Sequence, residues 1–152
     1  MSMVVYDAVL FLHILAAVMG LGVAFGFPIL ARTARTAEQA RYTLLLFKKL
    51  EIMPKIGSIT LLLSGILLAI LEPWLWKEGW FITSIVLYLI AQVLVIGLLP
   101  KGLKRQADIL DSHHGEELPA EYRAASKQNA KVEGMTHVLA FLLILLMVFK
   151  PF

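Results

Sequence analysis

Residues 8 to 31, AVLFLHILAAVMGLGVAFGFPILA, are uncharged, and His13 is their one ionisable side chain. A helix of this length measures roughly 36 Å, enough to cross the ~30 Å hydrocarbon core of a bilayer with some tilt. The polar ring of a histidine needs a partner in lipid, so such a residue usually faces a bundle interior, a cavity or a bound group. The stretch therefore predicts a transmembrane helix with His13 turned inward.

Small residues share the face of His13 along this predicted helix. Steps of three and four residues from His13 reach Ala16, Ala17, Gly20 and Ala24. A face this shallow suits either a closely packed neighbouring helix or a flat ligand, and the sequence leaves both open.

The composition indicates an integral membrane protein. Of the 152 residues, 59% are hydrophobic and 16% are charged, a balance outside the usual range of soluble domains. The absence of cysteine excludes disulfides, thiolate metal sites and covalent haem attachment. The positive charges follow membrane topology and form no basic patch interleaved with aromatic residues, so nucleic-acid binding is not expected. The N-terminal MSMVVYD lacks Lys and Arg, which argues against a cleaved signal peptide.

Four apolar segments predict an all-α, up-down-up-down four-helix bundle in a membrane, formed by a single domain over residues 1–152. A kink is expected at Pro54, and the third segment is expected to close at Pro100. The expected spans are about residues 8–31, 52–71, 80–99 and 131–149.

Basic residues set the expected orientation. Twelve of the fourteen Lys and Arg residues lie in residues 32–55 and 100–133. The positive-inside rule therefore places the connections 32–51 and 100–130 in the cytoplasm and both termini on the outer side of the membrane. Three tryptophans cluster at the expected outer interface, as aromatic belts do: Trp74, Trp76 and Trp80.

The second basic connection is predicted to contain two helical segments. LKRQADIL continues the third helix past its proline, SHHG is a break, and PAEYRAASKQNAKV begins a new helix with proline in a first-turn position. His113 and His114, in the break, are expected to be solvated turn residues.

A row of polar residues lies within the third span. Its members are four residues apart and share one face: Ser84, Tyr88 and Gln92. The row predicts either hydrogen bonds to a neighbouring helix or the wall of a polar cavity or proton path opposite His13. Gly57, Thr60 and Ser64 lie on one side of the second span and fit both readings.

A second intramembrane histidine, His137, follows Glu133 by one helical turn. The carboxylate at this spacing could hold one ring nitrogen while the other nitrogen binds a ligand. By helical rise, His137 lies roughly 20 Å below the outer end of its helix, and His13 roughly 9 Å below the end of its own. Ligation of one group by both histidines therefore stays open.

Other features carry weaker signals. Gly22 and Gly26 form a GxxxG pair on the face opposite His13, which suits a dimer or packing within the bundle. Glu51 and Lys55 are expected to neutralise each other. No metal site, copper ligand row, nucleophile–base pair or phosphate-binding glycine loop is present in the sequence.

Three stretches carry a resemblance to a known family. YDAVLFLHILAAVMGLGVAFGFPIL, EPWLWKEGWF and LLILLMVFKPF resemble the CopD-like superfamily of small bacterial membrane proteins, in particular an uncharacterised branch, a domain of unknown function. They also resemble the HemJ-type protoporphyrinogen oxidases. The resemblance implies haem b bound by His13. The oxidases carry a lysine shortly after the GW turn, whereas this chain has none near Ser84, so oxidase activity is not implied.

The leading hypothesis is a small inner-membrane protein that binds haem b through His13, with His137 as a further candidate ligand, for redox chemistry. The competing hypothesis is a non-enzymatic structural or accessory subunit, in which His13 bonds a neighbouring helix and the glycine faces serve assembly with a second copy or a membrane-complex partner. A third is a small transporter or channel lined by Ser84, Tyr88 and Gln92. Whether the chain is an enzyme stays open.

Overall fold

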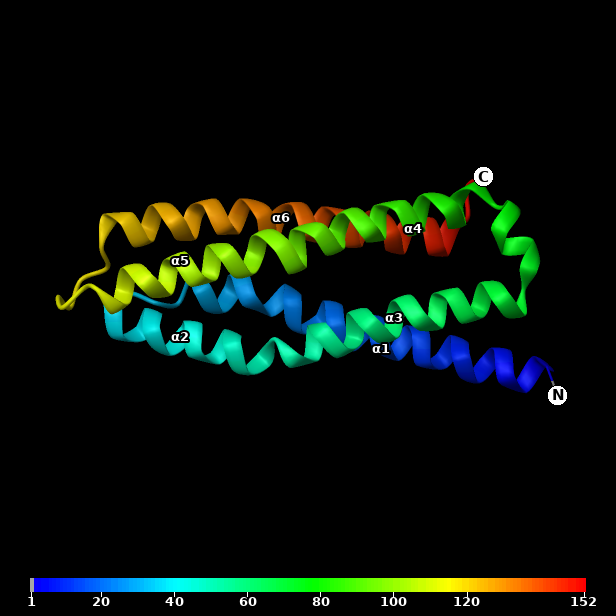
Figure 1. Ribbon diagram of the computed structural model, residues 1–152, viewed down its shortest axis with the longest axis horizontal. Coiled ribbons are helices and arrows are strands. Elements are labelled where there is room, and N and C mark those ends of the chain that lie inside the picture. Colours follow the sequence, from blue (N-terminus) through cyan, green and yellow to red (C-terminus); the bar gives the residue numbers. More distant parts are fainter. Residues whose placement is uncertain (1) are drawn as a thin grey trace.

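The computed structural model describes residues 2–152 and is an elongated bundle of helices (Figure 1). Four continuous rods are long and apolar enough to cross a membrane, which confirms the predicted all-α membrane bundle. Two of the rods are composite, since α2 leads into α3, and α4 leads through a π-helical segment, η2, into α5. In order, the elements are α1 (Ser2–Ala31), α2 (Ala37–Leu50), α3 (Ile52–Leu71), the 3-10 segment η1 (Pro73–Lys77), α4 (Gly79–Gln92), η2 (Val93–Leu98), α5 (Leu99–Asp111) and α6 (Ala120–Phe149).

The rods form two antiparallel hairpins. In the first, α1 packs along α3, and in the second, α6 packs along α4 and α5. The N- and C-termini lie at one end of the bundle, called here the terminal end, and the α1–α2 and α5–α6 connections lie at the other, the connection end (Figure 1). The two hairpins therefore meet along a seam made of α1, α2 and α3 on one side and α4, α5 and α6 on the other.

The bend in the second rod lies before the predicted position. Glu51 separates α2 from α3, so Pro54 falls in the first turn of α3 and not at the bend itself. A proline is tolerated there because a first-turn N–H has no partner inside its own helix. The Lys55 N–H still donates to the Glu51 carbonyl at 3.1 Å, so the rod stays nearly continuous.

The third rod passes Pro100 without ending. Immediately before this proline the helix widens into η2, in which the Leu99 N–H donates to the Leu94 carbonyl five residues back. A proline has no N–H to donate and its ring crowds the preceding turn, and a π-turn relieves both problems by adding one residue. The predicted continuation beyond Pro100 and the break near residue 112 are both present.

Two clusters of buried side chains close the bundle, one at each end. Ala69, Leu75, Trp80 and Phe81 pack together at the terminal end, where the Trp80 N–H donates to the Phe152 carbonyl at 2.9 Å. The connection-end cluster contains Ala34, Ala37, Ala40, Leu110 and Tyr122. Between the clusters most large apolar side chains point outward, as expected for surfaces that contact lipid.

Candidate functional site

His13 bonds to the neighbouring helix α3. Its Nδ1 lies 2.9 Å from the Ser64 hydroxyl, and that hydroxyl donates its single hydrogen to the Thr60 carbonyl at 2.6 Å. Ser64 must therefore accept from His13, which fixes the neutral imidazole in the tautomer with hydrogen on Nδ1. The Nε2 lone pair then remains an acceptor.

The small-residue face of α1 holds this same helix. A Cβ added at Gly57 of α3 would come within 2.8 Å of the Ala16 carbonyl oxygen and of the Gly20 Cα. Only glycine lets the two backbones approach so closely. Of the two readings that the sequence left open for this face, the structure has the closely packed helix.

His137 bonds to the backbone of α1. Its Nε2 lies 3.3 Å from the Ala24 carbonyl, and its ring stacks on Phe25 with 4.5 Å between the ring centroids. The Ala24 carbonyl lacks its usual helical donor, because the residue four positions later is Pro28, which has no N–H. His137 therefore supplies the hydrogen bond that the proline removes, as neighbouring helices do in membranes.

The structure does not bring the two histidines together. Their bonding positions on α1, His13 itself and Ala24, are eleven residues apart, about 16 Å along the helix. Two imidazole nitrogens on one metal ion would lie only about 4 Å apart. In this arrangement one iron cannot be held by both rings, and the face next to His13 is filled by α3, so a haem held between the two histidines does not fit.

The polar row of the third span divides between two partners. The Tyr88 hydroxyl donates to the Ser58 carbonyl at 2.6 Å, and the Ser58 hydroxyl donates to Gln92 Oε1 at 2.8 Å. These bonds join α4 to α3 across the seam between the hairpins. The Ser84 hydroxyl is buried and donates within its own helix, to the Trp80 carbonyl at 2.7 Å. Of the three residues in the row, Tyr88 and Gln92 therefore form hydrogen bonds between helices, and Ser84 does not.

Glu133 is buried in α6, with 9% of its surface exposed. Over residues 2–152, no hydrogen bond or ion pair joins its carboxylate to His137, whose ring is turned to α1. The predicted carboxylate–histidine pair is therefore not formed. The ion pair between Glu51 and Lys55 is formed, at 2.9 Å.

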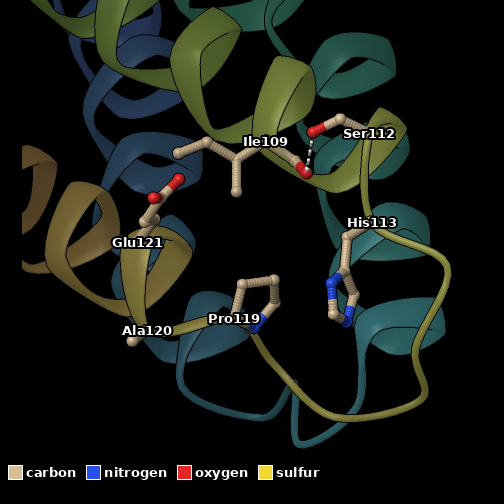
Figure 2. Close-up of a pocket in the computed structure, with 6 residues that line it drawn as sticks. All are labelled: Ile109, Ser112, His113, Pro119, Ala120 and Glu121. Carbon is tan, nitrogen blue, oxygen red and sulfur yellow. Dashed lines mark hydrogen bonds between the residues drawn. The ribbon is translucent and has the colours of Figure 1, made fainter.

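A cavity of about 370 Å³ lies at the connection end, between the end of α5 and the start of α6. Figure 2 shows the His113 ring beside Pro119 and facing the same hollow as Glu121. His113 is a turn residue as predicted, but it is not fully solvated, because its Nε2 is buried without a partner against Gly115. Arg41 fixes this turn by donating to the carbonyls of Leu110 and His113.

Three groups that take part in the polar contacts were not predicted from the sequence. Counting four residues back from Pro28 would have identified the free carbonyl of Ala24. Ser58 gave no signal, because a single polar residue in an apolar helix does not reveal which helix it will face. Asn129 gave none because it lies in a stretch already rich in polar side chains. Among the described residues, no group of three or more His, Asp or Glu side chains could hold a metal ion.

The comparisons with known proteins identify the family. Neither the curated proteins nor the solved structures gave a match. Residues 7–151 match the family described as "Predicted integral membrane protein (DUF2269)". This match shows an uncharacterised membrane family, and it does not by itself show the resemblance to the CopD-like or HemJ-type proteins. With nearly its whole length matched, the chain belongs to this family of integral membrane proteins.

Proposed function

We propose that the chain is a non-enzymatic membrane subunit whose intramembrane polar groups hold its helices together. The proposal is supported by one observation: each intramembrane histidine forms a hydrogen bond to a neighbouring helix. His13 is bonded to Ser64 on α3 and His137 to the Ala24 carbonyl on α1. Tyr88 and Gln92 likewise bond Ser58. Polar side chains in transmembrane helices commonly serve such interhelical bonds.

Assembly with a second copy in a bacterial inner membrane, with both termini outside, completes this proposal. A Cβ added at Gly22 or Gly26 would meet no atom within 4 Å, so the GxxxG face of α1 is free within one chain. Crosslinking of the protein in vesicles should give dimers in the wild type and fewer in Gly22→Leu. Monomers alone, together with stoichiometric haem, would contradict the proposal.

Haem b bound by His13 is the second candidate function. Its specific support is the tautomer, because a histidine held at Nδ1 by a neighbour presents Nε2 as a metal ligand. Haem would supply one-electron chemistry at this site. The remaining residues of the chain do not provide a second histidine at the same depth.

A His13→Gln variant separates the two functions. Glutamine can still bond Ser64, but it is a poor substitute for an iron-binding imidazole. A subunit in which His13 is structural should show no Soret band after expression with added haem, and the variant should unfold close to the wild type. A Soret band in the wild type that His13→Gln abolishes would favour haem binding.

A further inference from the structure

Glu133 combines burial in a membrane-spanning rod with the absence of a balancing charge. Its surface is 9% exposed, and within residues 2–152 no basic nitrogen lies within 4.0 Å of its carboxylate. An unpaired carboxylate in such surroundings is costly, and a carboxyl group avoids the cost by binding a proton. We propose that Glu133 is a proton-binding carboxyl that exchanges its proton with water at the connection end.

The elements packed against this part of α6 provide no compensating cation. The segment η2 contains no ionisable residue, and α4 contains only Tyr88. On α1 the ionisable side chains are Tyr6, Asp7 and His13, all near the terminal end, and Arg32 follows the last residue of the helix. All lysine and arginine residues of α5 and α6 are exposed, and so are the two aspartates of α5: Lys101, Lys104, Arg105, Asp108, Asp111, Arg123, Lys127 and Lys131.

Buried polar side chains continue from Glu133 toward the connection end. Asn129 and Tyr122 lie four and eleven residues before Glu133, on the same buried face of α6. On the facing helix α5, Gln106 is buried and donates to the Gly102 carbonyl at 3.3 Å. The Asn129 amide packs on Gly102, where an added Cβ would overlap its oxygen.

These groups form what we call the α5–α6 polar face: Gln106, Tyr122, Asn129 and Glu133. Buried polar groups with unused hydrogen-bonding capacity recruit ordered water. Hydroxyl and amide groups that alternate with water can pass a proton over the roughly 16 Å between Tyr122 and Glu133. The face therefore gives Glu133 a route to bulk water that avoids the lipid.

Infrared spectroscopy of the full chain in lipid vesicles tests the protonated state. A protonated carboxyl has a carbonyl band that an ionised carboxylate lacks. This band should be present in the wild type at neutral pH, absent in Glu133→Gln and retained in Glu51→Gln, since the Glu51 carboxylate is paired with Lys55. Identical spectra of the wild type and Glu133→Gln at neutral pH would overturn the proposal. Tryptophan fluorescence during unfolding checks that both variants are folded.

Exchange into deuterated buffer tests the route. The carboxyl band of the wild type should shift as Glu133 takes up deuterium from water. Asn129→Leu, which interrupts the polar face, should slow this shift, whereas Gln128→Leu on the exposed side of α6 should not. A band that never shifts in the wild type, or equal rates in the two variants, would overturn the exchange along this face.

Discussion

The crossing of α1 with α3 and the contact of α1 with α6 use different means. At the first, the two backbones meet at Gly57, where an added Cβ would come within 2.8 Å of the Gly20 backbone. At the second, the His137 side chain bonds the Ala24 carbonyl and stacks on Phe25. The first hairpin is thus held by shape at Gly57. Between the two apolar end clusters, its contact with the second hairpin is made by polar groups.

Gly57→Leu should give the largest effect, because the new side chain would displace the backbone of α1 and not merely a flexible side chain. We expect a loss of about 3 kcal/mol in the free energy of unfolding, measured by tryptophan fluorescence in mixed detergent micelles. The control is Gly97→Leu, placed where an added Cβ meets open space and outside the GxxxG face. Equal unfolding midpoints for the two variants would show that the crossing is not held by shape.

Ser64→Ala probes the polar bond within the tight crossing. The change leaves the His13 Nδ1–H without its acceptor, and we expect a loss of about 1.5 kcal/mol. Ser84→Ala is the matched control, since that hydroxyl bonds only its own helix. If both variants lost the same amount, the serine hydroxyl and not its bond to His13 would be the cause.

A double-mutant cycle tests the bond at the looser contact. His137→Leu should cost about 1 kcal/mol in the wild type. In Pro28→Ala, the restored N–H can pair with the Ala24 carbonyl, so the same change should cost close to nothing. Unfolding of the four proteins in micelles gives the coupling energy. A cycle without coupling would mean that His137 does not compensate for the proline.

Tyr88→Phe should have the smallest effect, about 0.6 kcal/mol, a typical value for an interhelical hydrogen bond in a membrane. It removes the bond to the Ser58 carbonyl while the ring stays in place. Tyr42→Phe, at an exposed position, serves as control. Solute flux in liposomes measured on the same variant addresses the transporter hypothesis, which requires Tyr88→Phe and Gln92→Leu to change the flux.

The four spans followed from the sequence because the length of an apolar segment and the position of charge are local properties. The partners of His13 and His137 depend on which helices meet and at what height, and no local pattern contains that information. Spacing placed Glu133 one turn from His137. The His137 ring instead bonds the Ala24 carbonyl, which has no donor in its own helix. Local pairing was overridden by an unsatisfied backbone group on another helix.

The widened turn at Val93–Leu98 has a consequence for the length of the third rod. A π-turn holds one residue more than the α-helix requires. An added side chain at Gly97 would meet open space. Removal of this residue would restore ordinary α-helical winding, and the residues before and after it would still face the same neighbours. The rod can therefore lose a residue at this point and still present Tyr88 to α3 and Gln106 to the interior of the bundle.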